Sequence, residues 1–576
     1  MTTRPGTASK TVLLSYDKIK KLAFAFLALP LFMFLVFFVR LYISIPISLV
    51  LILILIISGK RKHIKTRIME EPDGVRFNIW LLILIGVIVL IWCYLGGQGG
   101  FFYQTKDWFA RNAVFRDLIR YAWPPYYDVT DSILCYYVGH WLPSAAIGRC
   151  IFLLFGNLDL AWAIGNILLG LWTALGCYIS ILLLIVYLKP QKTRFIIMAV
   201  LLMIFFSGLD IVGWIKDGKT LTDILATQHL EWWQWYPQLQ FSSNTTCLYW
   251  VFNQSTAAWV GTLCFLNEKG TGNYGVIITC CMVSSILPSI GMAFIMILMI
   301  LFRFFSFLRE KKAGTFLKEL FSVQNILFIV LAVPVLYFYY SMNTTLNNNT
   351  ALEIIRVMPY KKIAVFCAGA LVLIILFIIL SIIQRKKGKN RKFGWIIGLA
   401  AVVLSFALSG FLGSNLELRY FWFLVLEAGL YYAILFPNYY KEPIYYISAC
   451  TLIIIPAIQV GTNSDFCMRA SIPGLIILMA LCGKKLVQDL GGMQTENKNA
   501  IKKVTSYVLI VVLVIGMVTP VVEIWRGIHN CIEKGTIMLT DDYFYTMNRY
   551  DENGIIPSNF VSINYRDTIF YNYIIQ

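Results

Sequence analysis

The sequence predicts an all-α polytopic membrane protein with about 13 to 15 transmembrane helices. Of the 576 residues, 59% are hydrophobic and 14% are charged, against about 45–50% and about 25% in soluble globular proteins. Apolar runs long enough to cross a bilayer recur along the whole chain. The formal charge of +19 is concentrated in short segments between these runs, which is typical of cytoplasmic loops. A soluble enzyme is therefore excluded, and we expect a lipid bilayer, and no nucleic acid, as a partner.

The lysines and arginines beside each apolar run predict the orientation of the first three helices. A cytoplasmic N-terminal tail, residues 1–21, ends in a lysine cluster, and a second basic cluster follows the second apolar run. Both ends of this helical hairpin therefore lie in the cytoplasm. Residues 22–95 contain these three transmembrane helices, predicted at residues 22–40, 41–58 and 78–95. The third helix leads outward and places residues 96–131 outside.

The remaining transmembrane core is predicted over residues 132–524. Later basic clusters are expected to be cytoplasmic, which puts external loops near residues 211–245, 341–362, 414–419 and 461–469. Residues 131–188 must then hold an odd number of crossings, so one or two half-length or re-entrant helices are expected there. The run from 274 to 304 is expected to be two helices broken at Pro288. An external C-terminal segment, residues 525–576, follows the last helix.

The first external loop contains a predicted interfacial helix. Trp108, Phe115 and Leu118 recur at helical spacing on one face, while Asn112 and Arg116 lie along another. This pattern is typical of a helix that lies in the membrane interface with its aromatic side toward lipid.

Asp107 begins this helix, one turn before Arg111. In a structural interpretation, Asp107 caps the helix and pairs with Arg111, and the arginines meet lipid phosphates. In a functional interpretation, Asp107 is a general base whose pKa is raised beside aromatic residues. Nearby arginines would then hold a phosphate or diphosphate leaving group. The candidate substrate-binding residues of this loop are Gln104, Arg111, Asn112 and Arg116.

Asp210 is the second candidate catalytic residue. It follows Ser207-Gly208, where an apolar run ends and the chain emerges. Asp210 either terminates a helix or faces the same aqueous pocket as Asp107, where it would bind a hard divalent cation. That cation would be Mg²⁺ or Mn²⁺, and no other cofactor is expected.

Aromatic and amide residues alternate over residues 229–259. Such a segment is typical of an aromatic belt at the membrane interface. It also offers the flat apolar faces and planar hydrogen-bonding groups of a sugar site. The candidate sugar-binding residues are Glu231, Trp232, Gln234, Asn244, Asn253 and Gln254.

Two further positions carry charges near the membrane. Asp465 and Arg469 are four residues apart on the predicted opening turn of a helix. They form either a structural ion pair or a substrate-binding pair in which Arg469 receives the phosphate of a lipid-linked substrate. Glu427 lies near the middle of a predicted crossing, where it would hydrogen-bond a neighbouring helix or couple transport to protons.

Five motifs together resemble a known group of proteins. They are YQTKDWFARNAVFRDLI at 103–119, LCYYVGHWLPSAAIGR at 134–149, FSGLDI at 206–211, QFSSNTTCLYWVFNQ at 240–254 and SDFCMRASIP at 464–473. The chain resembles large bacterial polytopic proteins related to the GT-C superfamily of integral membrane glycosyltransferases. The likeness runs from about residue 96 to residue 473 and includes the closing segment 559–574.

The resemblance implies an inverting transfer of a sugar from a polyprenyl-phosphate or polyprenyl-diphosphate donor at the external face of the bacterial cytoplasmic membrane. The acceptor would be a glycan, lipid or protein of the cell envelope. The superfamily places an essential acid beside an interfacial helix in the first external loop, and Asp107 matches that position. Asp210 matches a second acid that is often linked to a metal. Asp107 is followed by Trp108, so the paired acids of the best-known pattern are absent from this loop.

Two alternatives stay open. An envelope polysaccharide polymerase or ligase would also use lipid-linked glycans and would rely on external residues such as Arg469. A transporter or flippase of a lipid-linked glycan would depend on Glu427, but such proteins usually contain repeats, and the sequence shows none.

Overall fold

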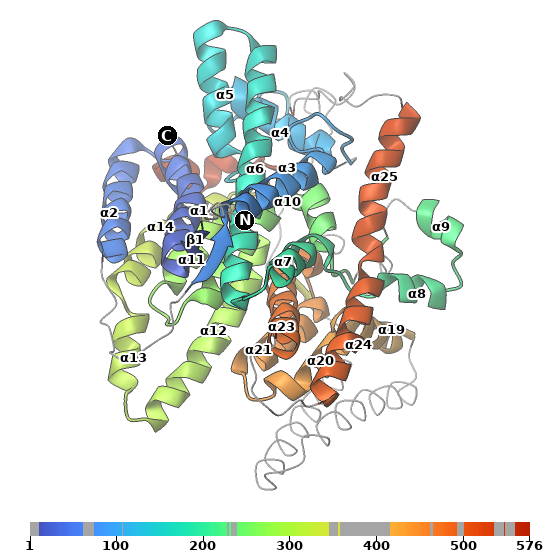
Figure 1. The fold of residues 1–576 in the computed structure, drawn as a ribbon. Helices are drawn as coiled ribbons and strands as arrows, with labels where there is room; N and C mark the ends of the chain where they lie inside the picture. Colours follow the sequence, from blue (N-terminus) through green and yellow to red (C-terminus); the bar gives the residue numbers. More distant parts are fainter. Residues whose placement is uncertain are drawn as a thin grey trace, which may run out of the picture.

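The computed structural model describes residues 11–60, 74–105, 107–226, 230–231, 239–344, 355–357, 415–460, 465–491, 500–534, 547 and 559–575. Within these ranges the chain is mostly helical, and short strands form three small antiparallel sheets. Figure 1 shows the helices gathered in one bundle, with the hairpin of α5 and α6 projecting at the top.

Helices before residue 345 lie close to the predicted ones. α3 begins after Asn78 and α6 after Asn157, and each of these asparagines accepts a hydrogen bond from a first-turn amide. The helices are α1 (Tyr16–Phe38), α2 (Leu41–Lys60), α3 (Ile79–Leu95), α4 (Trp108–Arg120), α5 (Leu142–Phe155), α6 (Leu158–Leu188), α7 (Thr193–Phe205), α8 (Asp210–Lys216), α9 (Leu221–Ala226), α10 (Asn244–Asn267), α11 (Tyr274–Met282), α12 (Ile286–Arg309), α13 (Ala313–Leu320) and α14 (Val323–Ser341).

The later helices contain several breaks. They are α19 (Asn415–Leu424), the π-helix η1 (Val425–Gly429), α20 (Leu430–Tyr439), α21 (Pro443–Ile454), η2 (Ile455–Ala457), α22 (Asp465–Ala470), α23 (Ile472–Leu490), α24 (Ala500–Gly516), α25 (Val518–Lys534), η4 (Tyr565–Asp567) and η5 (Phe570–Ile574). The strands are β1 (Thr11–Leu14), β2 (Val75–Asn78), β3 (Tyr126–Tyr127), β4 (Ser132–Leu134), β5 (Ile355–Val357), β6 (Ile458–Val460) and β7 (Val561–Ser562).

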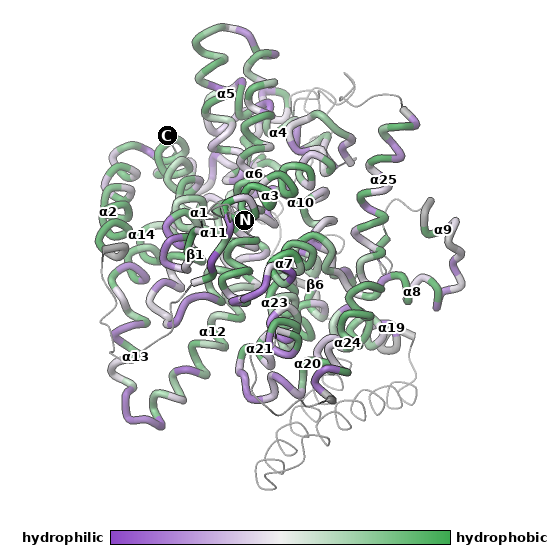
Figure 2. The backbone as a smooth tube through the Cα atoms, viewed as in Figure 1, coloured by the Kyte–Doolittle hydropathy of each residue, from purple (hydrophilic) through white to green (hydrophobic). Residues whose placement is uncertain are grey.

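Six helical segments of the described chain are long and apolar enough to cross a membrane, or seven if α7 and α8, which bend by 48°, count as one span. The six are α1, α6, α12, α14, Arg419–Tyr439 and Lys502–Glu533. Figure 2 shows hydrophobic residues along most of α2 and α5 and hydrophilic ones at the turn between α12 and α13. These features confirm a multi-pass α-helical membrane protein. The total of about 13 to 15 crossings stays a prediction, because the helices expected between residues 358 and 414 lie outside the described residues.

The stretch after the first external loop holds one short and one long helix. α5 has 14 residues, about 21 Å, and α6 has 31 residues, about 46 Å. Against a hydrocarbon thickness of about 30 Å, only α6 is long enough to cross. This agrees with the half-length helix predicted within residues 131–188.

Two predicted boundaries are wrong. The break between α11 and α12 lies at residues 283–285, and Pro288 lies in the first turn of α12. Proline is tolerated there because a first-turn amide has no helical partner to lose. α25 continues to Lys534, so residues 525–534 belong to the last helix and not to the segment after it.

The described part of the C-terminal segment packs on the first external loop. β7 pairs with β4, with Leu134 opposite Val561 and Ile133 opposite Ser562. The last residues also reach the turn between α1 and α2, where Arg40 Nε donates to the carbonyl of Ile575 at 2.9 Å. This packing closes one face of the loop that contains α4.

α10 lies at the centre of the bundle and is buried along most of its length, with α6 and α23 among its neighbours. Ser243 caps its N-terminus by accepting a hydrogen bond from the Thr246 amide at 3.0 Å. The helix is kinked at Val251, where the backbone leaves helical geometry. The segments that carry the candidate site residues pack around this helix.

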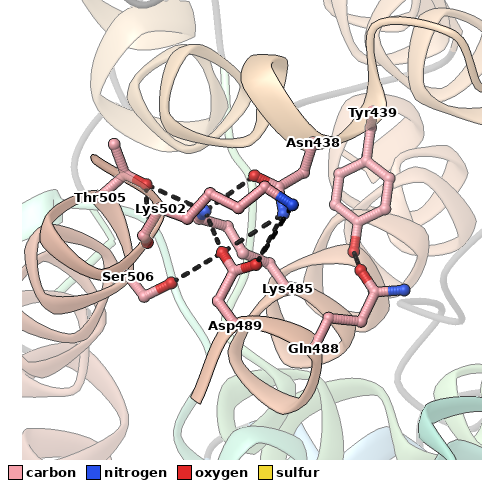
Figure 3. Close-up of polar contacts among 8 residues, drawn as sticks. All are labelled: Asn438, Tyr439, Lys485, Gln488, Asp489, Lys502, Thr505 and Ser506. Atoms are coloured by element: carbon pink, nitrogen blue, oxygen red, sulfur yellow. Dashed lines mark hydrogen bonds and ion pairs between the residues drawn. The ribbon is translucent and has the colours of Figure 1, made fainter. Parts of the chain in front are cut away.

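A buried polar cluster joins three helices at the end of α23 (Figure 3). Lys485 Nζ lies 2.7 Å from Asp489 Oδ2, and both side chains are buried. Asn438 of α20 donates to the same carboxylate, and Ser506 of α24 donates to it at 3.0 Å. Lys485 also donates to Thr505 of α24 at 3.0 Å. The ion pair is therefore fully hydrogen-bonded, as a buried pair must be.

Candidate functional site

The first external loop is held in place by its own amide side chains. Gly97, Gly99 and Gly100 have positive φ and form a tight turn after α3. Gln104 Nε2 donates to the Gly97 carbonyl at 2.8 Å, and Asn112 Nδ2 donates to Gln104 Oε1 at 2.8 Å. These two candidate substrate-binding residues thus tie the glycine turn to α4.

α4 confirms the predicted helix, but its apolar face packs on protein instead of lipid. Trp108 stacks on Phe252 of α10 with ring centroids 4.5 Å apart, and its indole nitrogen donates to the Tyr249 carbonyl at 2.9 Å. Phe115 and Ile119 pack against α5 and α6, close to Gly148 and Gly165. The aromatic side is therefore turned inward, because α5 and α6 cover it. A position of α4 at the membrane interface stays a prediction.

Asp107 and Arg111 form the expected ion pair, with Oδ2 3.4 Å from Nη2. Asp107 does not cap α4, since its side chain accepts no hydrogen bond from the first turn. The Asp107 side chain is 43% exposed, whereas that of Arg111 is 5% exposed. Arg111 Nε and Nη1 are buried without a hydrogen-bond partner in the part of the chain that the structure describes.

Asp465 and Arg469 repeat this arrangement on α22. Asp465 Oδ1 lies 3.1 Å from Arg469 Nη2, the Asp465 side chain is 43% exposed, and the Arg469 side chain is 9% exposed. Arg469 Nη1 donates to the hydroxyl of Tyr137 at 2.7 Å. Arg469 Nε is buried and has no partner among the described residues.

The two ion pairs meet around Tyr137, although they are more than 350 residues apart in sequence. Burial lowers the pKa of Arg469, but the charges of Asp465 and Asp107 are close enough to outweigh it and raise that pKa. The charges of Arg111 and Arg469 both act on the phenol of Tyr137. The structure therefore brings together the predicted pairs at residues 107–111 and 465–469, which come from segments far apart in the sequence.

The chemistry of this site favours an anion. A guanidinium donates five hydrogen bonds and accepts none, so the buried N–H groups of Arg111 and Arg469 need acceptor oxygens. Among the described residues each arginine forms an ion pair with one carboxylate, and both carboxylates are partly open to solvent. A phosphate group offers several charged acceptor oxygens and would satisfy both guanidiniums.

Arg116 lies elsewhere on α4. Its guanidinium sits 5.7 Å from the ring centroid of Trp162 on α6. Arg116 is about two and a half helical turns beyond Asp107, so its predicted contact with the same ligand stays a prediction.

Asp210 is buried instead of facing an aqueous pocket, with 1% of its surface exposed. Its Oδ2 accepts hydrogen bonds from Thr519 of α25 at 2.7 Å and from Ser207 at 3.2 Å. Glu427, also 1% exposed, lies close enough to Asp210 for their charges to interact, and its carboxylate packs directly on Gly208. Among the described residues no group of three His, Cys, Asp or Glu side chains is placed to share a metal ion. Metal binding by Asp210 stays a prediction.

Glu231 and Asn244 support the start of α10. Glu231 accepts a hydrogen bond from Gln240 Nε2 at 3.0 Å and from the Ser243 amide at 3.2 Å. Asn244 Nδ2 donates to the Met203 carbonyl at 3.0 Å. A carboxylate at a helix N-terminus stabilises the helix dipole, so Glu231 has a structural role in addition to any contact with sugar.

Asn253 and Gln254 follow the kink of α10 and are fully buried. No described residue is hydrogen-bonded to either carboxamide. Unsatisfied buried amides need water or a ligand, which keeps these two residues as candidates. The other two sugar-binding candidates, Trp232 and Gln234, lie outside the described residues.

Tyr137 is the site residue that reasoning from the sequence missed. It stands in a motif with no helical or strand spacing, and its partner Arg469 follows 332 residues later. A pair of adjacent tyrosines just after the predicted external loop was the only signal in the sequence. Comparisons with protein-family models, with curated proteins and with solved structures found no match for this chain.

Proposed function

We propose that this protein is an inverting membrane glycosyltransferase that moves a sugar from a polyprenyl-phosphate-linked donor to a cell-envelope acceptor. One observation carries the proposal. The half-exposed carboxylate of Asp107 lies beside the buried guanidinium of Arg111, and its charge also acts on the buried guanidinium of Arg469; both arginines have N–H groups without partners in the described chain. A base and an anion-binding group in one site are what such a transfer needs.

The chemistry assigns one role to each group. The acceptor hydroxyl gives its proton to Asp107, and its oxygen attacks the anomeric carbon. The bond between that carbon and the phosphate oxygen breaks, and its electron pair leaves with the phosphate. The guanidiniums of Arg111 and Arg469 stabilise the negative charge that builds up on the phosphate. A single displacement inverts the anomeric centre. We place the reaction at the external face of a bacterial cytoplasmic membrane, with the N-terminus in the cytoplasm and the C-terminal segment outside.

The test compares sugar transfer by wild type, Asp107→Asn and Asp465→Asn in membranes supplied with labelled polyprenyl-phosphate sugars. Removing a general base typically costs about 10²- to 10⁴-fold, so Asp107→Asn should lose transfer by at least two orders of magnitude. Asp465→Asn is the matched control, because Asp465 has the same exposure and the same arginine spacing. It removes the partner of Arg469 but leaves the base in place, so we expect it to lose less transfer than Asp107→Asn. Full transfer by a folded Asp107→Asn protein would sink the assignment.

A second candidate function is the transport of a lipid-linked glycan. It is favoured by the buried carboxyls Asp210 and Glu427, which lie where α7 bends into α8 and where η1 interrupts a span. Broken helices around a buried polar group are frequent in transporters. Movement of a labelled glycolipid across vesicles without bond formation, abolished by Glu427→Gln, would favour this function over transfer.

A further inference from the structure

Tyr137 occupies the point where the two ion pairs meet. Its hydroxyl oxygen accepts a hydrogen bond from Arg469 Nη1 at 2.7 Å, and the Arg469 guanidinium lies 5.9 Å from the centre of its ring. The ring of Tyr136 packs against it, with centroids 3.7 Å apart. The charges of Arg111 and Asp465 also reach this phenol. Tyr137 is therefore fixed in place by contacts on several sides.

The direction of the bond to Arg469 decides what the hydroxyl can do. A guanidinium only donates, so the Tyr137 oxygen is the acceptor and its own proton points elsewhere. The hydroxyl of Tyr136 lies within reach, and because a hydroxyl can donate as well as accept, it leaves the Tyr137 proton able to turn toward a ligand. Burial raises the pKa of Tyr137. The positive charge of Arg469 lowers that pKa, but by less than burial raises it. The hydroxyl therefore keeps a proton that is free to be donated.

We propose that Tyr137 donates a hydrogen bond to the anionic oxygen held by Arg111 and Arg469, and so completes a three-residue phosphate site. The inference rests on the proposed function, in which that anion is the phosphate of the sugar donor. Both guanidiniums are buried and the charges of both act on the phenol, which adds a short neutral donor next to Arg469. Hydrogen bonds to an ionised acceptor are stronger than neutral ones.

The bond gains strength during the reaction. A phosphodiester donor carries one negative charge, and the phosphate that leaves carries up to two, because the electron pair of the broken bond stays on its oxygen. A donor aimed at that oxygen therefore stabilises the transition state more than the bound substrate. Tyr137→Phe should accordingly lower kcat more than it raises KM. A general disturbance of the structure would have no reason to change kcat and KM in this unequal way.

The first test measures binding of inorganic pyrophosphate and inorganic phosphate to the purified full-length protein in detergent by calorimetry. A hydrogen bond to a charged group contributes enough for about a ten- to hundred-fold loss of affinity when it is removed, and we expect Tyr137→Phe to show this loss. Tyr136→Phe is the matched control, since it deletes the neighbouring hydroxyl and leaves the proposed donor in place. It should bind pyrophosphate as the wild type does.

If Tyr137→Phe unfolds, a fluorotyrosine placed at position 137 provides the second measurement. Fluorine makes the phenol a better donor without changing its position, so pyrophosphate affinity should rise.

Unchanged affinity in both substituted proteins would overturn the role of Tyr137 and leave the transfer function standing. Wild type that transfers sugar but binds neither anion would also overturn it. If the wild type transferred no sugar, the proposed function would instead fall, and the measured loss of pyrophosphate binding in Tyr137→Phe would then still identify an anion site.

Discussion

The two members of each ion pair in the candidate site differ in their exposure to solvent. The arginines are buried and the aspartates are 43% exposed, both in the first external loop and on α22. An exposed pair contributes little to stability, whereas an arginine without its carboxylate would leave a buried charge unpaired. The aspartates therefore have two tasks, because they neutralise the arginines and remain accessible to a substrate.

The buried carboxyl of Asp117 on α4 gives a testable prediction about stability. It is completely buried and accepts hydrogen bonds from the Met547 amide at 2.8 Å and from the Tyr127 hydroxyl at 3.2 Å. Burial raises the pKa of Asp117 to about 7, against the lowering by these hydrogen bonds and by Arg116 and Arg120. In the unfolded chain the carboxyl titrates near its ordinary value of 3.8. The unfolded state therefore releases the proton first as pH rises.

Protonated Asp117 contributes about 4 kcal/mol to the free energy of unfolding. This contribution is present in full below about pH 4 and is lost as the pH rises toward 7. We expect Asp117→Asn to remove this pH dependence and to be more stable than wild type at pH 8. Denaturant unfolding in detergent between pH 5 and pH 8 measures the difference. If the unfolding free energies of the wild type and Asp117→Asn changed with pH in the same way, Asp117 would not be the titrating group.

At this scale the sequence predicted some contacts and not others. The pairs of Asp107 with Arg111 and of Asp465 with Arg469 were predictable because both depend on a spacing of four residues in one helix. The contact of Tyr137 with Arg469 and that of Asp210 with Glu427 were not, because each joins residues that are hundreds of positions apart. Long-range contacts leave no trace in the local order of residues.

Among the elements, α22 is held in position by α12. A Cβ atom added to Gly291 would lie 1.9 Å from the carbonyl oxygen of Ala470, the residue after Arg469. That oxygen belongs to the backbone, so Gly291→Ala must push the two helices apart. Overpacking typically costs about 1–3 kcal/mol, and we expect a lower melting temperature together with weaker pyrophosphate binding.

The control is Gly314→Ala on α13, because a Cβ at Gly314 meets nothing within 4 Å. Differential scanning calorimetry and pyrophosphate titration of both variants give the comparison. If Gly291→Ala bound pyrophosphate and melted as the wild type does, a tight contact between α12 and α22 would be contradicted.

The polar cluster in Figure 3 gives a second prediction for elements. Asp489→Ala removes the carboxylate beside the fully buried ammonium of Lys485, so α20, α23 and α24 lose their shared contact. Breaking a buried pair in this way costs about 3–5 kcal/mol. The double variant with Lys485→Met and Asp489→Leu should recover most of that loss, because no charge is left unpaired.

A double-mutant cycle of unfolding free energies measures this coupling. Single variants as stable as the wild type would show that the pair contributes nothing to holding the three helices together.

Helix positions were the most predictable elements. Hydropathy and flanking charges placed α3, α10 and α22 within a few residues, since both signals are local. The kink of α10 and the π-helix were not predicted, because neither has a proline or glycine at its centre and both depend on neighbouring helices. The inward packing of α4 was missed for a related reason. An aromatic helix face looks the same in sequence whether lipid or another helix covers it.

Across the whole molecule, several polar contacts join segments that are predicted to lie on the same side of the membrane. Lys20 pairs with Glu268 at 2.5 Å, and Arg303 donates to the Lys269 carbonyl at 3.1 Å. These residues belong to segments predicted to be cytoplasmic or to adjoin them. Asp131 pairs with Arg566 at 2.8 Å in segments predicted to be external. The arrangement agrees with the expected topology, with the N-terminus inside and the C-terminal segment outside.

The orientation is tested with cysteines at two exposed positions, Lys312→Cys and Arg566→Cys. The parent protein has serine in place of the exposed Cys150, of the partly exposed Cys450 and Cys531, and of Cys367, which lies outside the described residues. A membrane-impermeant maleimide should label Arg566→Cys in intact cells and Lys312→Cys only after permeabilisation. The parent without either new cysteine should stay unlabelled. The reverse pattern would invert the topology and move the candidate site to the cytoplasmic face.

The pairing of each buried arginine with its own aspartate has a consequence for how a ligand arrives. The formal charges of these four side chains cancel, so the two pairs themselves add no net charge to the site. Long-range attraction, which speeds the encounter of oppositely charged partners and weakens as salt is added, gains nothing from them. Recognition begins only at contact, where the ligand's oxygens compete with two carboxylates for the same N–H groups. The site therefore selects by shape and bond geometry, in a membrane where anionic headgroups are everywhere and a strongly positive site would be filled by the wrong ones.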